Sequence, residues 1–398
     1  RDRSVSRGLG DVYKRQTFNR QQICNAVSPL MSAVSGKSTL TAADGILIEA
    51  KFPDICTLTT FDLEKGIRLT VNAKVEEEGS YIINAHKFNQ TIRVMDGEEI
   101  ALTVDDKLCA TFESGRSSHK TGSLKAQDFP EIPRLTSEKG FVVNQSVLKN
   151  MLSKVAYAMG INDPRPMLNG CYIRTIKDTL SLVTCDTFKL AVCSCKTKFD
   201  SIEGEESDKN TDFSFIVPVK SVNELIKLLS DDEEKKATVY MSHKNIVIDL
   251  DGIVFFSRLI TGDYLDYERV IIKNHKIFVQ TDKQRLLSAL ERAALITEER
   301  IVGSVRSNVK LEICKNILKV SAVSSSGSIY DEVEIEHTGE DLSISFNNRF
   351  LMDSVKACSA EKIRIALSSK FTSVNIEPAQ KDEDNEELFM LLPVRTKD

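Results

Sequence analysis

Tyr81-Ile-Ile-Asn84 is an apolar stretch with strand character that ends in a residue able to begin a helix. The same arrangement returns at Phe215-Ile-Val-Pro218 and at Ile344-Ser-Phe-Asn347. An Asn side chain can cap the first turn of a helix, and Pro is favoured at a helix start. Because the three helix starts lie about 130 residues apart, the sequence predicts three copies of one structural unit.

A second helix in each unit is predicted from three further caps. Asn19, Asn144 and Thr281 each precede apolar residues that recur at helical spacing. The oxygen of each cap can bond a backbone N–H group that has no partner inside the helix. Helices are therefore expected at 20–34, 85–95, 145–159, 219–230, 282–296 and 348–358.

Short strands are predicted between these helices. Apolar and polar residues alternate in Ile67-Arg-Leu-Thr-Val71 and Ile246-Val-Ile-Asp-Leu250, and turn pairs such as Asp96-Gly97, Asp251-Gly252 and Lys315-Asn316 are typical of hairpins. The expected fold class is α+β, with three repeated domains of antiparallel sheets and paired helices. The expected strands are Ile46–Glu49, Cys56–Thr60, Ile67–Asn72, Ile100–Val104, Thr179–Thr184, Thr238–Met241, Ile246–Leu250, Ile253–Ser257, Leu311–Cys314, Ile317–Val320 and Ser373–Glu377.

Length and composition agree with several globular domains. The chain has 398 residues, of which 41% are hydrophobic and 28% charged, and its nine cysteines are scattered without a CxxC pair. No apolar run is long enough for a membrane span, so we expect a cytoplasmic protein with reduced thiols. Arg1–Gln16 lack apolar periodicity and are interpreted as a non-native leader. The expected domains are 17–138, 139–271 and 272–398.

The predicted helices carry positive charge in an acidic chain. They contain twelve Lys or Arg residues and four Asp or Glu residues, whereas the whole chain has a formal charge of -5. For one helix this bias is most simply a solvated face. Six helices that share it favour a common surface that binds duplex phosphates without sequence preference, since few aromatic residues are available to stack single-stranded bases.

Signals of catalysis are weak. Gly36-Lys37-Ser38 follows a helix and lacks the first glycine of a phosphate-binding loop. Cys185, Cys193 and Cys195 have no second cysteine pair or nearby histidine, so a buried structural role is favoured over a metal site. The acidic run Asp231-Asp-Glu-Glu234 is interpreted as a solvated loop. We therefore expect no enzyme activity, no cofactor and no metal.

A series of short motifs lies in a fixed order along the chain. They are Thr60-Phe-Asp-Leu-Glu64, Ser114-Gly-Arg116, Asp128-Phe-Pro-Glu-Ile-Pro133, Arg165-Pro-Met-Leu-Asn-Gly170, Cys185-Asp-Thr-Phe-Lys-Leu-Ala191, Ser257-Arg-Leu-Ile-Thr-Gly262, Phe346-Asn347 and Leu391-Leu-Pro-Val-Arg395. Through them, residues 18 to 395 resemble the beta subunit of bacterial DNA polymerase III, the sliding-clamp family. The resemblance implies a non-catalytic processivity factor: a head-to-tail homodimeric ring around duplex DNA. It also implies docking of the polymerase catalytic subunit, the clamp loader and repair proteins through short hydrophobic motifs.

The resemblance also assigns site residues. The implied peptide-binding pocket comprises Leu168, Cys185, Thr187, Phe188, Lys189, Leu190, Arg269, Val270, Asn347, Phe350, Phe371, Ser373, Met390, Leu391, Leu392, Pro393, Val394 and Arg395. The expected DNA-facing residues are Arg20, Lys37, Lys87, Arg93, Lys149, Lys154, Lys220, Lys227, Arg285, Arg292, Arg349 and Lys356. The expected dimer interface contains Arg116, His119, Thr121, Leu295 and Ile296.

The sequence departs from the family pattern at several positions. The family usually has Thr-Asp-Gly-His-Arg-Leu where this chain has Cys185-Asp-Thr-Phe-Lys-Leu190, and Leu265 stands where Pro is common. The first strand is expected to be mostly replaced by the leader. Two alternative functions remain open at this point: a repeat scaffold that binds only proteins, and a cysteine-based hydrolase.

Overall fold

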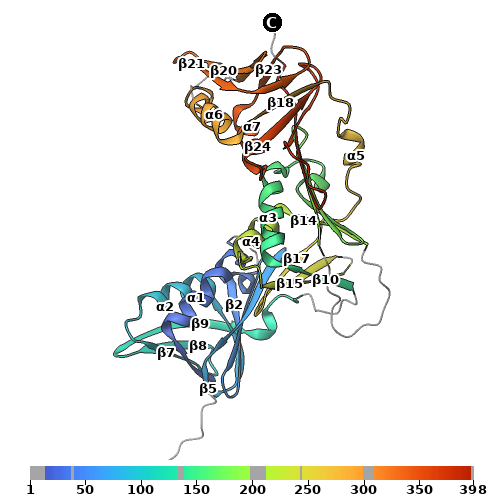
Figure 1. The fold of residues 1–398 in the computed structure, drawn as a ribbon. Helices are drawn as coiled ribbons and strands as arrows, with labels where there is room; N and C mark the ends of the chain where they lie inside the picture. The colour runs from blue at the N-terminus through green and yellow to red at the C-terminus, as the bar shows by residue number, and fades with distance from the viewer. Residues whose placement is uncertain are drawn as a thin grey trace, which may run out of the picture. The chain divides into compact units, whose positions relative to one another are not determined.

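The computed structural model describes residues 14–36, 40–132, 139–197, 212–242, 244–298 and 308–395 (Figure 1). The chain forms two compact units, one with residues up to Gln145 together with Leu228–Arg258, and one with Ser146–Lys227 together with Leu259 onward. Strands are numerous and helices few, and the strand pairs are antiparallel. The α+β prediction is confirmed.

The first unit is built on one sheet of 13 strands in the order β10-β15-β16-β17-β4-β3-β2-β6-β9-β8-β7-β1-β5. Its strands are β1 (Lys14–Asn19), β2 (Gly45–Lys51), β3 (Ile55–Phe61), β4 (Lys65–Asn72), β5 (Lys74–Glu77), β6 (Gly79–Asn84), β7 (Glu99–Val104), β8 (Cys109–Ser114), β9 (Ser117–Lys125), β10 (Lys139–Asn144), β15 (Lys236–Met241), β16 (Asn245–Asp249) and β17 (Ile253–Arg258). Helices α1 (Arg20–Leu30) and α2 (Ala85–Val94) pack side by side in this unit (Figure 1).

The second unit contains a sheet of nine strands, β14-β11-β12-β13-β26-β25-β24-β18-β22, and one of four, β21-β20-β19-β23. Their bounds are β11 (Gly170–Ile176), β12 (Thr179–Cys185), β13 (Lys189–Lys196), β14 (Phe213–Pro218), β18 (Ile277–Asp282), β19 (Val309–Cys314), β20 (Ile317–Val323), β21 (Ser328–Glu334), β22 (Glu336–Thr338), β23 (Leu342–Phe346), β24 (Lys362–Leu367), β25 (Val374–Pro378) and β26 (Asn385–Leu391). Helices α6 (Lys283–Thr297) and α7 (Asn348–Ala357) lie against each other (Figure 1).

The predicted helix starts are largely confirmed. The side chains of Asn19, Asn84 and Asn347 accept backbone hydrogen bonds at the first turns of α1, α2 and α7. Helices α3 (Gln145–Val155) and α4 (Val219–Leu228) begin where predicted. The cap of α6 was wrongly assigned to Thr281: Asp282 accepts the hydrogen bond from the Arg285 backbone instead, and a carboxylate is the stronger acceptor there.

Two local predictions differ from the structure. Strand β1 spans Lys14–Asn19, so residues 14–16, which we assigned to the leader, form its first half. This strand pairs with β5 and β7, and the domain edge that we expected to be mostly replaced is a complete strand. Asp251-Gly252 and Lys315-Asn316 do form hairpin turns, whereas Asp96-Gly97 connects α2 to β7.

Two of the predicted repeats share the hydrogen bonds of a hairpin turn. Asp62 accepts from the backbone N–H groups two and three residues later, and the Lys65 ammonium lies 2.9 Å from its other carboxylate oxygen. About 124 residues on, Asp186 makes the same two backbone contacts, and Lys189 lies 3.1 Å from it. Both lysines also donate to a carbonyl at the end of the preceding helical segment. The two turns are therefore copies of one structure.

Strand pairing joins the repeats. β4 pairs with β17 in the first unit, and β13 pairs with β26 in the second. In the first unit Gly66 lies opposite Phe256, and at the equivalent point of the second unit Leu190 lies opposite Met390. Each sheet thus continues from one repeat into the next. We call these two places the first junction and the second junction.

A buried ion pair ties helix α3 to the second junction. The Lys154 ammonium lies 2.7 Å from the Glu387 carboxylate on β26, with side chains 16% and 6% exposed, and Glu387 also accepts from the Ser359 backbone. Burial by itself raises the pKa of Glu387, but these hydrogen bonds reverse the effect and hold the pKa below its ordinary value. The ion pair therefore stabilises the folded, ionised state.

We predict that Lys154→Ala lowers the free energy of unfolding by about 3 kcal/mol at pH 7, because it leaves a buried carboxylate without its cation. Since the folded-state pKa of Glu387 is depressed, the pair stabilises the fold above the unfolded-state value of about 4.3 and is lost as the pH falls through the folded-state value. The difference from the parent should therefore shrink in acid. Urea titrations at several pH values measure this.

Lys362→Ala is the matched control, because Lys362 forms an exposed pair with Glu336 at 3.7 Å. It should cost less than about 1 kcal/mol. Equal losses for the two variants, or a Lys154→Ala loss that does not change with pH, would contradict the assigned role of the buried pair.

Candidate functional site

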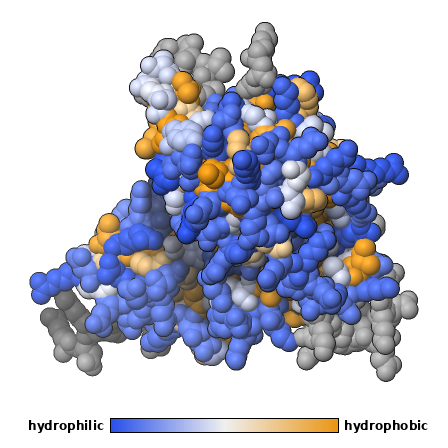
Figure 2. Space-filling view, turned by 45° about the horizontal axis from the view of Figure 1, so that its top comes forward, coloured by the Kyte–Doolittle hydropathy of each residue, from blue (hydrophilic) through white to orange (hydrophobic). Residues whose placement is uncertain are grey.

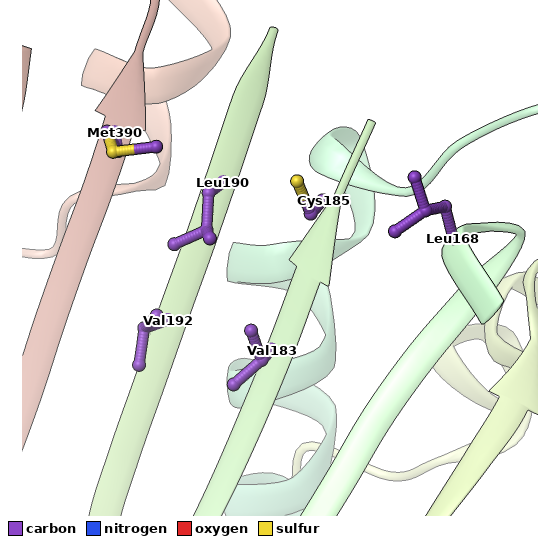
Figure 3. Close-up of a cluster of buried hydrophobic side chains, with 6 residues drawn as sticks. All are labelled: Leu168, Val183, Cys185, Leu190, Val192 and Met390. Carbon is purple, nitrogen blue, oxygen red and sulfur yellow. The ribbon is translucent and has the colours of Figure 1, made fainter. Parts of the chain in front are cut away.

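The second junction contains a cluster of buried apolar side chains within the second unit. The cluster is formed by β12, β13, β26 and the 3-10 turn Pro166–Leu168 (Figure 3). The cluster consists of Leu168, Val183, Cys185, Leu190, Val192 and Met390. Four of these six were predicted, and Val183 and Val192 extend the set because they alternate with Cys185 and Leu190 along the same strands.

Several large apolar side chains of the second unit are exposed. Phe188 is 56% exposed, Val270 45%, Phe371 58% and Leu392 40%. On the face drawn in Figure 2, hydrophilic residues predominate and hydrophobic ones form small separate patches. Phe188 lies in the β12–β13 turn, Leu392 follows β26, and Val270 precedes Ile271, which packs against the cluster. Exposed apolar side chains beside a buried cluster are typical of an interaction site.

The positions of Phe188 and Leu392 are fixed by the backbone. The N–H of Leu392 donates to the carbonyl of Phe188 at 2.9 Å, and the N–H of Val394 donates to the carbonyl of Ser345 at 2.8 Å. The chain after β26 is thus held against both the β12–β13 turn and β23. Thr187, in this turn, has φ 81°, a conformation that favours glycine.

Some predicted pocket residues have structural roles. The Lys189 ammonium bonds the Tyr157 carbonyl at 2.8 Å and lies 4.4 Å from the centre of the Phe350 ring, so it holds the turn in place. Asn347 caps α7 by accepting from the Phe350 backbone. Ser373 is buried, and Arg269 pairs with Asp266 at 2.8 Å.

Two tyrosines that were not predicted pack against the cluster. Tyr172 and Tyr264 stack with ring centres 4.8 Å apart, and both pack against the buried cluster. Sequence alternation along β11 places Tyr172 on one face of the sheet, but only the tertiary structure shows that its ring meets Tyr264.

The first junction has the same backbone pairing, but aromatic side chains fill it. The structural equivalents of Cys185, Leu190 and Met390 are Phe61, Gly66 and Phe256. The rings of Phe61 and Phe256 lie 5.4 Å apart, and a side chain at Gly66 would collide with Phe256.

At the rim, the first junction has polar residues where the second junction has apolar ones. Glu64 stands where the second junction has Phe188, and the exposed Arg258 stands where it has Leu392. Only the second of the two equivalent junctions therefore presents exposed apolar groups at these positions.

The structure gives no support to a cysteine nucleophile. Burial raises the pKa of the Cys185 thiol and brings that of Cys193 to about 12. A catalytic thiol requires the opposite shift. Within the described residues, no three His, Cys, Asp or Glu side chains are grouped as metal ligands, and no helix is long and apolar enough to cross a membrane.

The expected DNA-facing residues have varied surroundings. Arg292 pairs with Asp331, Arg285 with Glu334, Lys356 with Glu291 and Lys227 with Glu224; Arg20 donates to backbone carbonyls of α2. Lys154 is mostly buried in its pair with Glu387, which leaves its charge unavailable to a phosphate. Lys87, Arg93, Lys220 and Arg349 are exposed and Lys149 half-buried, while Lys37 lies outside the described residues.

The expected interface residues lie near unpaired strand edges. Among the described strands, β21 pairs only with β20, and the first half of β9 pairs only with β8. Arg116 and His119 are exposed at β9, with Thr121 half-buried. Leu295 on α6 is 75% exposed, and Ile296 is half-buried.

Comparison with known proteins identifies the same three repeats. Sequence models of the DNA polymerase III beta subunit match residues 15–133 as the N-terminal domain, 142–266 as the central domain and 268–393 as the C-terminal domain. The beta sliding clamp of Staphylococcus epidermidis is 26% identical over 390 residues, which cover 96% of this chain and 99% of that protein.

Solved structures agree. The sliding clamp of Bacillus subtilis has a TM-score of 0.89 at 22% identity, covering 97% of this chain and all of its own. The DNA polymerase III beta subunit of Thermotoga maritima has a TM-score of 0.83 at 25% identity, covering 96% of this chain and all of its own. Because the three domain models together span nearly the whole chain, it belongs to the DNA polymerase III beta subunit family, the non-catalytic sliding clamps of DNA replication.

Proposed function

We propose that this chain acts as a head-to-tail homodimeric ring that encircles duplex DNA and tethers the replicative polymerase, clamp loader and repair proteins. The observation that carries the proposal is the pattern of strand pairing between repeats. At two junctions the strand edges are paired within the chain, β4 with β17 and β13 with β26. The third equivalent pair consists of β21 and the first half of β9, whose edges have no partner strand among those described.

Pairing of β21 with β9 of another subunit would complete the series. Such a contact joins two different surfaces of the subunit, one on each partner. Subunits joined in this way form a closed ring when the rotation between them allows it. An unpaired strand edge is a template for association, which supports this route over a chain that stays monomeric. The exposed Leu295 and the half-buried Ile296 would then be covered by the partner subunit.

We predict that replacing Leu295 and Ile296 together with Asp gives monomers. Burial of two such side chains contributes several kcal/mol at about 25 cal/mol per Å², and charges cannot be buried there without partners. Sedimentation at several concentrations measures the oligomeric state. A replacement of the exposed Val94 by Asp, on α2, is the control and should leave the assembly unchanged. A stable dimer from the double variant would refute this interface.

The helical basic residues support contact with DNA. Their exposed ion pairs contribute only about 0–1 kcal/mol each, so a phosphate can take the place of the carboxylate at little cost. Lys154 is excluded from the proposed set because its pair is buried. The remaining residues would act together, since binding by enclosure needs no strong individual contact.

We predict that reversing Arg93, Lys149 and Arg349 to Glu weakens retention on nicked circular DNA and flattens its salt dependence. Each lost phosphate contact should reduce the slope of log affinity against log salt by about 0.9. The control reverses Lys51, Lys107 and Lys273, which lie outside the basic helices. If both triple variants load and hold DNA like the parent at low salt, the proposed DNA surface is wrong.

The buried apolar cluster of the second junction, together with the exposed Phe188 and Leu392, supports a pocket for partner docking. A motif with two apolar side chains would insert against Leu168, Leu190, Val270, Phe371, Met390 and Leu392. Phe188 and Thr187 stand where the family usually has His and Gly, which makes the proposed pocket more apolar and narrower at its mouth. The protein-only scaffold remains the alternative, and DNA retention distinguishes it.

We predict that Leu392→Ala weakens binding of a polymerase-tail peptide about 10- to 150-fold, because a buried leucine-sized contact is worth about 1.5–3 kcal/mol. Phe188→His should have a smaller effect, since it keeps an aromatic ring at the rim. Fluorescence anisotropy and a melting curve measure both variants. If Leu392→Ala lowers the melting temperature but leaves the affinity unchanged, Leu392 is a core residue and the pocket lies elsewhere.

A further inference from the structure

The internal repeat gives a register for the proposed contact between subunits, which we call the third junction. It would join β21 of one subunit to the first half of β9 of another. On the β21 side, the N–H of Ser324 donates to the carbonyl of Gly327 at 2.9 Å. The turns before β4 and β13 contain the same backbone bond, which ends at Lys65 and at Lys189. Gly327 is therefore the equivalent of these two lysines.

The β9 side is aligned by a backbone contact that all three repeats share. Leu124 pairs with β6, and the residues in this place in the other repeats are Ile260 and Val394, whose N–H groups bond β14 and β23. The residues five positions earlier are therefore equivalent to one another: His119, Phe255 and Phe389.

Two of these three equivalent positions hold fully buried aromatic rings. Phe255 lies opposite Ile67 of β4, and Phe389 lies opposite Ala191 of β13. The third position holds His119, which is exposed in the single subunit. Pairing of β9 with β21 would thus bury an imidazole where the other junctions bury a phenyl ring.

The imidazole lies on the face of the sheet that the helices cover. His119 is directly opposite Phe112 on β8, with ring centres 6.3 Å apart, and Phe112 packs against Phe88 of α2. With the register above, Ile329 of the partner subunit would lie opposite His119. The partner's α6 ends beside this place, since its Ile296 lies next to Gly327 at the start of β21. The surroundings of the buried ring would therefore be mainly apolar.

Few charges face His119 among the described residues. On the same face of β8 and β9, its neighbours are uncharged: Ala110, Phe112, Ser114, Ser117 and Thr121. The partner's Asp331 would lie opposite Ser117, and this carboxylate is already paired with Arg292 at 2.5 Å. The titratable residues of α2 and of the end of α6 are exposed to water in the single subunit: His86, Lys87, Arg93, Glu291, Arg292 and Glu298.

We propose that His119 makes assembly of the ring pH-dependent: the subunits associate with the imidazole neutral, and its protonation weakens the dimer. The inference rests on the proposed function, because His119 is covered only when β9 pairs with β21. A histidine in water titrates at about pH 6.5, and burial among apolar side chains disfavours its charged form. Association is therefore at full strength above about pH 6.5 and is lost progressively as the pH falls below that value.

The test measures the dissociation constant of the dimer by sedimentation at about pH 7.5 and about pH 5.5. Each β9–β21 contact should weaken about tenfold between these values, because one proton must leave His119 before the contact forms. A closed homodimer contains this contact twice, so its dissociation constant should rise about 100-fold in acid.

His119→Phe supplies the side chain found at the two equivalent positions. It should remain dimeric at both pH values, with a dissociation constant that changes less than about twofold. A dimer of this variant in acid also shows that the subunits stay folded there. His86→Gln is the matched control, because His86 is exposed at the first turn of α2, and it should keep the full pH dependence of the parent.

The proposal is overturned if the parent dimer has the same dissociation constant at both pH values, or if His119→Phe weakens in acid as the parent does. Tighter association of the parent in acid would also overturn it, and would instead indicate that protonated His119 pairs with the partner's Asp331. Failure of the proposed interface is separate, since the double replacement of Leu295 and Ile296 by Asp would then leave the dimer intact.

Discussion

Hydrogen bonding along strand edges is the constraint on which this structure depends. Each repeat ends its own sheet at a strand whose backbone groups need partners, and the next repeat supplies them through β17 or β26. Unpaired backbone groups are costly when water is excluded, so the repeats are joined by continuous sheets rather than by loose linkers. The same requirement, applied to β21 and β9, supports the proposed association between subunits.

Within this shared backbone, a few substitutions separate a filled junction from an open one. Two equivalent turns hold the junctions in place, one made by Asp62 with Lys65 and the other by Asp186 with Lys189. At the first junction the absent side chain of Gly66 gives space to Phe256. At the second junction the corresponding volume is divided between smaller aliphatic and sulfur-containing side chains, and the apolar rim is left exposed.

Electrostatic context decides which basic residues can act at a surface. Lys154 and Arg292 both lie on helices, yet Lys154 is mostly buried beside Glu387, whereas the pair of Arg292 with Asp331 is about half exposed on the arginine side. A buried pair resists exchange because the remaining carboxylate would be desolvated and alone. An exposed pair can be exchanged for another anion. Formal charge along the sequence does not separate these two cases.

The sequence by itself determined the α+β class, the threefold repeat, the helix starts at Asn19, Asn84 and Asn347, and the family, because caps and alternation are local and the family motifs follow one another in a fixed order. Four residues assigned to the pocket by the resemblance lie in the buried cluster, because the family motifs that contain them are local stretches of sequence. Only the tertiary structure decided that Phe256 fills one junction, that Tyr172 meets Tyr264, and that Lys154 is paired. These facts depend on contacts between segments far apart in the chain, which no local pattern specifies.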